Sequence, residues 1–405
     1  MALLSIAAAF GSKFAETLSF ANDLPEVSSD SVETLLSVMA SSMLAIATFS
    51  VASMVSAYAS ASSAATPRSF SLVVRDDVSQ NALSTFIGSF IFSIVALSAV
   101  TNDFFEPAGL FCLFVLTITV FGIVIITFVR WVDRIARLGR LGETVDKVEA
   151  ATKAALARRR INPTLGCQVC TTDNPEGIAL ASPRVAYVQH IDMEKLQSWA
   201  QQHDATISVH TLPGTFMSPE RPLAYVKFDS GNPALKNQDE LLKCFKLDDD
   251  RVFDDDPRFG LIVLSEIAGK ALSPAVNDPG TAIDVVGTLV RLFGEWSKPL
   301  ASDEETEVAF DRIAVPTLSV RDMFDDAFTS LARDGARTVE LAVRLQKALN
   351  ALADVNNGVM RDAANHHGNL ALQRAEKALD IEHDIALVRS AAHWLPTHNC
   401  ERQAH

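Results

Sequence analysis

Residues 108–129 read AGLFCLFVLTITVFGIVIITFV and contain no charged side chain. A helix of that length covers about 33 Å at about 1.5 Å per residue, which is enough to cross a hydrocarbon core of about 30 Å. An uncharged run longer than about 18 residues favours a membrane span over a buried helix of a soluble core. This stretch therefore predicts an integral membrane protein.

Two further uncharged runs precede this stretch. Residues 83–100 read LSTFIGSFIFSIVALSAV, and the link TNDFFEP joins them to the later run. In that link Asn102 and Asp103 can stop one helix, and Pro107 can start the next. The two runs therefore predict a tight antiparallel hairpin of two spans.

The third run, residues 35–59, reads LLSVMASSMLAIATFSVASMVSAYA and is rich in Ser and Ala. Small residues allow helix backbones to approach closely, so we expect this helix inside a bundle or at an oligomer interface. Residues 1–20 are apolar only at their start and are interpreted as a partial first span. The predicted spans are 35–59, 83–100 and 108–130.

Serines recur at helical steps along this Ser/Ala-rich run. A stripe of hydroxyls can line a water-filled path, and it can equally serve close packing between helices. Both interpretations stay open from the sequence. The candidate pore-lining or helix-packing residues are Ser42, Ser50, Ser53, Ser56, Ser60 and Ser63.

Basic residues predict the orientation of the spans. Four arginines follow the last span closely, and the 64–80 loop carries two more, whereas 21–34 has only acidic charges and the 101–107 link has no basic residue. The positive-inside rule then places 64–80 and everything after 130 in the cytoplasm. We expect the interface anchors to be Arg130, Trp131, Arg134 and Arg137.

The overall charge narrows the class of partner. The 405 residues include 49 acidic and 35 basic side chains, a net charge of −14, which disfavours nucleic acid because phosphate binding needs a basic surface. The 5 cysteines are an odd, scattered set and do not form a disulfide framework. They suit a reducing compartment.

The pattern after the last span changes twice. Residues from about 180 carry short β-branched segments such as VAYVQHI and TISVHTL, and those from about 257 show long helical periodicity. We predict an α+β multidomain membrane protein with a transmembrane helical bundle, a small β-rich domain and a helical domain. The predicted domains are 1–140 (transmembrane), 141–179 (connector helix and linker), 180–256 (mixed β) and 257–400 (helical).

The turn SPAVNDPGT lies between two predicted helices. An Asp before a Pro can cap the following helix, and the exposed helix N-terminus can also hold an anion. We favour a capped helix–turn–helix joint over an anion site. The residues of this turn that we single out are Ser273, Pro274, Asn277, Asp278, Pro279 and Thr281.

Other motifs carry little chemistry. Cys167 and Cys170 form one CxxC pair, but zinc needs four ligands and no second pair follows, so free thiols are the default. The acidic run between Asp248 and Asp256 lacks the spacing of a calcium loop and is interpreted as a solvated loop. No HExxH, P-loop, GxGxxG or GxSxG occurs. We expect no metal, no cofactor and no enzyme activity.

Several segments resemble a known family. FGLIVLSEIAGKALSPAVNDPGTAIDVVGTL, with its core from Ala271 to Ala282, resembles the signature of the bacterial membrane protein family known as domain of unknown function 2254. The segment that begins YVQHIDMEKL and the small-residue helix ending in TPRSF are similar to that family as well. The resemblance implies a bacterial inner-membrane protein with N-terminal spans and a cytoplasmic C-terminal domain, and implies no particular activity.

The function is a choice between two classes. Residues 35–59, 83–100 and 108–129 contain no charged side chain, which argues against a proton-driven transporter or a voltage sensor. One hypothesis is an oligomeric channel-like protein that conducts an ion or small solute and has a cytoplasmic assembly or gating domain. The alternative is a membrane-anchored scaffold or sensor whose cytoplasmic domain binds a protein or ligand. The expected partners are the lipid bilayer, a second copy of the chain and an unknown cytoplasmic ligand or protein.

Overall fold

The structure is a computed structural model, and its chain divides into two compact units, Met1–Thr144 and Val145–His405. The residues that the structure describes are 25–64, 66–74, 77–137, 141–170, 176–229, 238–300, 308–355 and 358–396.

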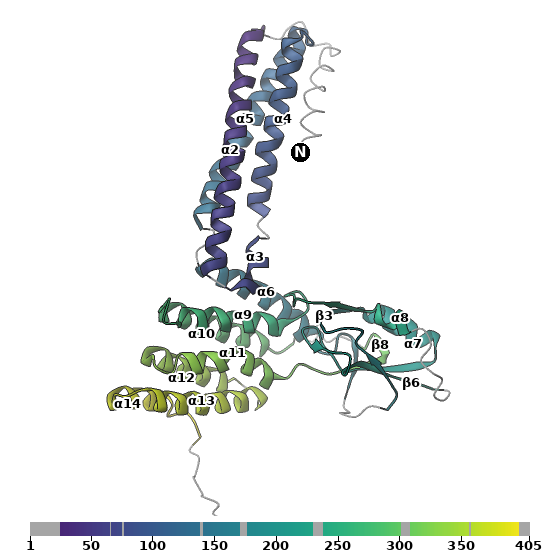
Figure 1. The fold of residues 1–405 in the computed structure, drawn as a ribbon, viewed down its shortest axis with the longest axis vertical. Coiled ribbons are helices and arrows are strands. Elements are labelled where there is room, and N and C mark those ends of the chain that lie inside the picture. The colour runs from purple at the N-terminus through teal and green to yellow at the C-terminus, as the bar shows by residue number, and fades with distance from the viewer. Residues whose placement is uncertain are drawn as a thin grey trace, which may run out of the picture. The chain divides into compact units, whose positions relative to one another are not determined.

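The first unit consists of helices among its described residues (Figure 1). Three of them are long and apolar enough to cross a membrane, and each contains one predicted span. The predicted link between the last two is also found: Asp103 adopts a positive φ of 49° and Pro107 starts the next helix. The predicted partial span at 1–20 lies outside the described residues. The elements are α2 (Ser29–Ala64), η3 (Pro67–Ser69), α3 (Phe70–Val74), α4 (Asp77–Thr101) and α5 (Pro107–Arg137).

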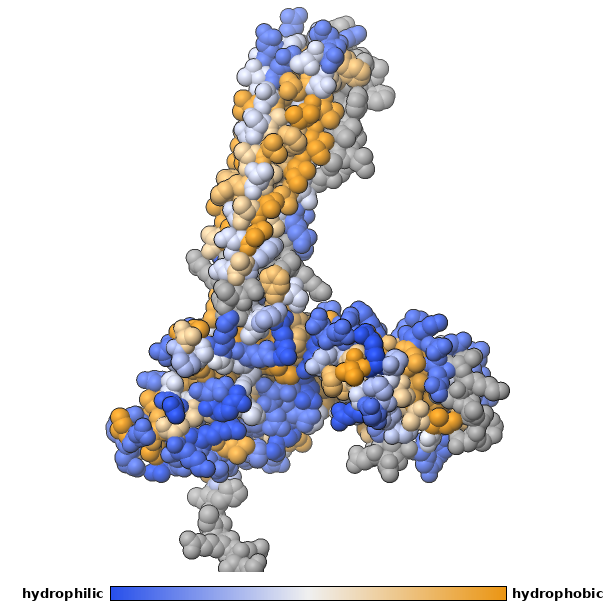
Figure 2. Space-filling model, viewed as in Figure 1, coloured by the Kyte–Doolittle hydropathy of each residue, from blue (hydrophilic) through white to orange (hydrophobic). Residues whose placement is uncertain are grey.

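The three long helices pack on one another through a narrow apolar seam. Leu36 of α2, Phe92 of α4 and Leu113 of α5 are almost fully buried in one cluster. A second cluster contains Phe86 and Trp131. Large apolar side chains also cover the outside of these helices, and Figure 2 shows them over the middle of the bundle. An apolar outer surface suits a lipid solvent.

The second unit begins with most of a connector helix and continues into a β region. Two sheets form there, one of five strands in the order β1-β8-β4-β6-β2 and one of three in the order β5-β3-β7. Strand β8 pairs in parallel with β1 and β4, and the other pairs are antiparallel. The elements are α6 (Leu141–Ile161), β1 (Cys167–Val169), β2 (Ile178–Ala181), β3 (Ala186–Ile191), α7 (Met193–Gln202), β4 (Ala205–Val209), β5 (Phe216–Met217), β6 (Pro222–Phe228), α8 (Gln238–Leu242), β7 (Phe245–Asp248) and β8 (Phe310–Val315).

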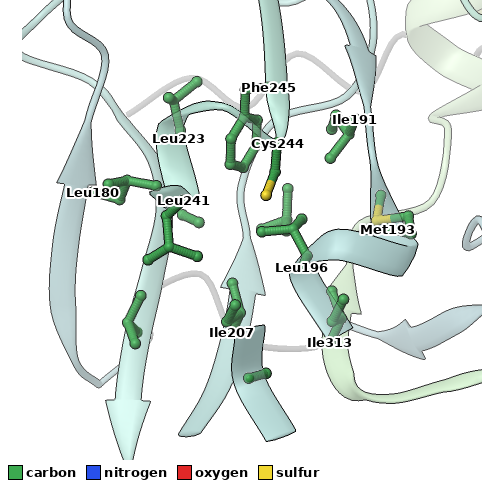
Figure 3. Packing of buried hydrophobic residues seen from close by; sticks show 14 of the residues in the cluster. Leu180, Ile191, Met193, Leu196, Ile207, Leu223, Leu241, Cys244, Phe245 and Ile313 are labelled. Atoms are coloured by element: carbon green, nitrogen blue, oxygen red, sulfur yellow. The ribbon is translucent and has the colours of Figure 1, made fainter. Parts of the chain in front are cut away.

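The core of the β region lies between the sheets and α7. Leu196 of α7, Ile207 of β4 and Ile313 of β8 belong to one buried cluster (Figure 3). Helix α7 starts where the Asp192 side chain accepts a hydrogen bond from the Lys195 N–H at 3.0 Å. Such a cap satisfies a backbone donor that the first turn of a helix leaves unpaired.

The rest of the second unit is mainly helical, with two corrections to the predicted boundaries. Strand β8 lies inside the region that we predicted as helical, 257–400, and β1 lies inside the predicted linker, 141–179. Both are short strands whose pairing partners are distant in sequence, so local pattern does not reveal them. The helices are α9 (Pro257–Ala271), α10 (Pro279–Trp296), α11 (Val320–Asp334), α12 (Val339–Ala353), α13 (Gly358–Ala378) and α14 (Glu382–Ala391).

Candidate functional site

The first turn of α9 holds a buried charge. Asp256 is the N-cap of the helix, and its Oδ1 accepts a hydrogen bond from the Phe259 N–H at 3.1 Å. Its Oδ2 accepts from the Arg251 guanidinium at 2.7 Å, and the Arg251 side chain is 16% exposed whereas that of Asp256 is 2% exposed. A buried carboxylate needs such partners because desolvation of an unpaired charge is very costly.

The β region approaches this carboxylate through a glycine. Gly214 has a φ of 93°, a conformation that other residues rarely adopt, and a Cβ built there would overlap the Asp256 carboxylate. The Gly214 N–H donates to the Val188 carbonyl at 2.7 Å, which fixes the turn on β3. The turn PGT therefore closes one side of the site by direct backbone contact with Asp256.

A second arginine links α9 to α11. Arg258 Nε donates to Asp326 at 2.6 Å, and its Nη1 donates to Asp322 at 2.9 Å. Asp326 is the inner partner, with 15% of its side chain exposed, and Asp322 is the outer one, with 48% exposed. Helix α11 is capped nearby by Ser319, whose hydroxyl accepts from the Asp322 N–H at 3.2 Å.

Burial perturbs the two inner carboxylates in the same direction. Desolvation raises the pKa of Asp256 above its usual value, and the Arg251 guanidinium opposes that shift. Desolvation likewise raises the pKa of Asp326, and Arg258 opposes it. Each arginine therefore keeps an otherwise unfavourable buried charge in place.

Arg251, Arg258, Asp322 and Asp326 line a cavity of about 380 Å³ in the second unit, and Gly214 also belongs to its lining. The charges on its wall balance, with two arginines facing two aspartates, and hydroxyl and apolar groups complete the lining. Such a wall suits a small polar ligand that carries both an anionic group and a hydrogen-bond donor. The polar side chains in this lining include His210, Arg251, Arg258, Thr317, Asp322 and Asp326.

A second cavity of about 380 Å³ lies at the C-terminal end of α6, with Arg158, Arg159 and Asp254 in its lining. Arg159 is only 4% exposed, and its Nη1 has no hydrogen-bond partner among the residues that the structure describes. Burial lowers the pKa of Arg159, and Asp255 and Asp256 oppose that shift. The loop before α9 therefore contributes charged residues to both cavities, Arg251 to the first and Asp254 to the second.

The predicted serines of α2 differ in their exposure. Ser42 and Ser53 are half-buried, and Ser56 and Ser60 are exposed. Ser50 is fully buried, and its hydroxyl has no hydrogen-bond partner among the described residues. The side chain of Ser63 lies outside the described residues.

Of the predicted interface anchors, one is placed differently from our expectation. Arg130 is exposed, Arg134 pairs with Glu143 at 3.2 Å, and Arg137 pairs with Asp133 at 3.1 Å. Trp131 is only 1% exposed, so it does not face outward as an interfacial anchor would. Its ring packs instead against aromatic rings within the bundle, which are Phe49, Phe86 and Phe128.

The family-signature turn is a capped joint between α9 and α10. Asp278 Oδ1 accepts from the Thr281 N–H at 3.1 Å, and its Oδ2 accepts from the Thr281 hydroxyl at 2.6 Å. The Thr281 hydrogen bonds lower the pKa of Asp278. Asn277 takes a positive φ of 52°, and its N–H donates to the Ser273 carbonyl at 2.8 Å. Pro274 is exposed, and Pro279 is the first residue of α10.

Sequence reasoning missed the charged cluster at α9. The acidic run was interpreted as a solvated loop, but its last member, Asp256, is 2% exposed. The Asp-Pro pair before an apolar helix signalled a cap, and nothing local signalled that Arg251, Arg258 and Asp326 would meet there. Among the described residues, no group of three or more His, Cys, Asp or Glu side chains is arranged to hold a metal ion.

The chain is similar to one protein family and to several uncharacterized proteins. A family model described as "Predicted membrane protein (DUF2254)" matches residues 1–351. Uncharacterized proteins of Mycobacterium tuberculosis and Mycobacterium bovis are 27% identical over 233 residues, which is 56% of this chain and 45% of each relative. The match thus spans less than half the length of these relatives. No solved structure matches the chain.

Proposed function

Because this chain belongs to the DUF2254 family of predicted membrane proteins, we propose that it is a membrane-anchored sensor. In this proposal the apolar helices of the first unit hold the protein in the bilayer. The second unit binds a small polar ligand in the cavity at the first turn of α9. The proposed role is binding and not catalysis.

The observation that carries the proposal is the paired charge around that cavity. Arg258 contacts Asp326 on its buried side and Asp322 on its more exposed side. A ligand carboxylate or phosphate could displace Asp322 from Arg258, because exposed ion pairs are weak, and a charge-assisted contact to an arginine fork is strong. The released Asp322 could then accept a hydrogen bond from an amino or hydroxyl group of the same ligand.

Such an exchange of partners would change the contacts between α9, α11 and the loop after β7. Arg258 lies in α9, its two partners lie in α11, and Arg251 connects the same helix start to the loop after β7. A ligand that changes the partner of Arg258 would change how α9 and α11 are held. A sensor needs such a two-state contact, in which the ligand favours one state.

A binding assay on the full-length protein in detergent tests the proposal. The thermal unfolding midpoint is measured with a panel of amino acids and phosphorylated metabolites at millimolar concentration. We expect at least one member to raise the midpoint, since a ligand at about 100 times its dissociation constant stabilises by about 2.7 kcal/mol. Arg258→Gln should abolish the rise.

Arg389 provides the matched control. It also contacts two carboxylates, Glu376 and Glu382, but it lies outside the cavity lining, and 53% of its side chain is exposed. Arg389→Gln should therefore keep the ligand response of the unaltered protein. A ligand response that survives in Arg258→Gln would refute the assignment of the cavity.

The location of the second unit is part of the proposal. We infer a multi-pass protein of the bacterial inner membrane whose second unit is cytoplasmic. The support is the basic cluster at the end of α5, which contains Arg130, Arg134 and Arg137, because basic residues flank the cytoplasmic ends of spans.

A second candidate function is an oligomeric pore for an ion or small solute. The observation that favours it is the outer surface of α2, where Ser56 and Ser60 are exposed on a helix of lower hydropathy than α5. In such a pore this surface would line a path shared between copies of the chain. Light scattering in detergent tests for the oligomer, and ion flux into liposomes that is lost in Ser56→Leu tests for the path. A monomer would refute this second candidate.

A further inference from the structure

One cysteine of the β region lies against a histidine. Cys170 follows β1, and its Sγ is 3.2 Å from the Ser208 hydroxyl oxygen and 3.8 Å from the His210 Nε2. Ser208 belongs to β4, and His210 comes two residues later, so both side chains project to the same face of that strand. The Cys170 N–H donates to the Val315 carbonyl at 2.8 Å, which fixes the thiol beside this face.

The surroundings leave this thiol accessible. Cys170 and His210 are both half-buried, and His210 also lines the cavity at α9. A small molecule that enters the cavity therefore reaches the imidazole that contacts the thiol. This combination of a thiol, an adjacent base and an open approach is the arrangement that activates cysteine nucleophiles.

The other described cysteines are placed differently. Cys167 is 1% exposed, and burial raises its pKa to about 12. Cys244 is 3% exposed, and burial raises its pKa to about 11. Cys112 lies within α5. Cys167, only three residues from Cys170, is thus an internal reference for an inert thiol.

We propose that Cys170 is a modification site, a thiol that His210 activates for oxidation by small hydroperoxides. In the first step His210 Nε2 accepts the thiol proton, and the Ser208 hydroxyl donates a hydrogen bond to the resulting sulfur anion. The thiolate then attacks the terminal oxygen of the hydroperoxide, and the O–O bond breaks as the S–O bond forms. The sulfur is oxidised by two electrons to a sulfenic acid.

The same step reduces the hydroperoxide. Its leaving oxygen departs as hydroxide or alkoxide and takes the proton from the His210 imidazolium, which gives water or an alcohol and restores the neutral ring. No further co-reactant is needed. The inference does not depend on a ligand in the cavity, and it assigns the second unit a redox-responsive position beside it.

Site-resolved mass spectrometry of the full-length protein in detergent tests the inference. The protein is treated with hydrogen peroxide at pH 7, and sulfenic acid is trapped with dimedone. We expect trapping at Cys170 and none at Cys167 or Cys244. Iodoacetamide should also alkylate Cys170 much faster than these two. Equal reaction at Cys170 and Cys167 would overturn the proposed site.

The role of the imidazole is tested separately with His210→Gln. If His210 Nε2 takes the thiol proton, loss of this base should slow alkylation of Cys170 at pH 7. At pH 10 the rates of the variant and the unaltered protein should converge, because hydroxide can then act as the base in place of the imidazole. A rate at pH 7 that is equal in both proteins would overturn activation by His210.

Two further variants keep this result interpretable. His210 packs edge-on against Tyr225 with ring centroids 5.2 Å apart, so His210→Phe preserves the ring contact if the glutamine variant does not fold. It should slow alkylation at pH 7 to the same degree. His203→Gln is the control, because His203 stacks on Trp199 and should leave the Cys170 rate unchanged.

Discussion

The two units of this protein place apolar and charged side chains in opposite ways. In the first unit, large apolar residues such as Phe49, Ile118 and Ile126 are more than half exposed, and Ser50 is buried. In the second unit, Phe324 and Leu331 are buried, and charged side chains such as Arg389 and Glu382 are exposed. The difference indicates two solvents for one chain. Lipid accepts apolar surface and disfavours charge, and water does the reverse.

The largest expected effect is the loss of the buried pair in the second unit. Arg251→Leu leaves Asp256 buried without its guanidinium partner, and removal of one partner of a buried pair costs about 3 kcal/mol or more. Thermal or denaturant unfolding of the detergent-solubilised protein measures this loss. Arg333→Leu is the control, since Arg333 forms an exposed pair with Asp334 and should change stability by about 0.5 kcal/mol at most. Equal losses of stability in Arg251→Leu and Arg333→Leu would contradict the expected difference between a buried and an exposed ion pair.

The next largest effect is expected when a charged residue is placed on the outer surface of the first unit. Ile118 is 51% exposed on α5, and Ile118→Arg should cost about 3 kcal/mol of membrane insertion if lipid surrounds this helix. The fraction of protein that stays in membranes after carbonate washing measures insertion. Val359→Arg is the matched control, because Val359 is 61% exposed on α13 and should tolerate the charge. Full insertion of Ile118→Arg would contradict lipid contact at this surface.

A smaller effect concerns a buried histidine of the second unit. Burial lowers the pKa of His367 to about 4, and Asp325, whose Oδ1 lies 3.0 Å from Nε2, opposes the shift. In the unfolded chain the His367 imidazole binds a proton near pH 6.5, whereas in the folded protein it binds one only near pH 4. Folding stability is thus present at pH 7 and falls as the pH drops through this window, by about 2 kcal/mol at pH 5.

Unfolding midpoints between pH 7 and pH 5 check this dependence. His367→Gln should flatten the pH profile, since the variant has no imidazole to protonate at that position. His383→Gln is the control, because His383 is exposed and should leave the slope unchanged. A slope that is the same in all three proteins would show that another group is responsible.

The smallest effect is expected inside the first unit. The Ser50 hydroxyl is buried without a hydrogen-bond partner among the described residues, so Ser50→Ala should be neutral or stabilise by up to about 1 kcal/mol. Ser93 is buried too, but its hydroxyl donates to the Ser89 carbonyl at 2.8 Å, so Ser93→Ala should be the more destabilising change. Unfolding in detergent compares them. A larger loss for Ser50→Ala would show that its hydroxyl has a partner beyond the described residues.

The sequence predicted the first unit better than the second because its signal is local. A long uncharged run specifies a spanning helix whatever its neighbours are, and all three predicted spans lie within helices of the structure. Such an uncharged run does not indicate which way the Trp131 side chain faces. That side chain is buried because Phe86 and Phe128 meet it from α4 and α5.

The second unit depends on pairings between distant residues. Strand β8 joins the sheet at a position beyond two helices, and Arg258 meets Asp326 across 68 positions of sequence. Capping signals are again local, and the Asp-Pro pairs at 256–257 and 278–279 both start helices as their residue types imply. The sequence therefore predicted where the helices beside the candidate cavity begin. It did not predict which charged residues line the cavity.

The central claim is that a lipid-embedded first unit holds the second unit in the cytoplasm. Paired reporter fusions after Leu395 in bacterial cells test it most directly, with green fluorescent protein as one reporter and alkaline phosphatase as the other. The account predicts a fluorescent first fusion and an inactive second, because the phosphatase needs the periplasm for its disulfides. An active phosphatase with a dark fluorescent protein would place the second unit on the other side of the membrane and contradict the account.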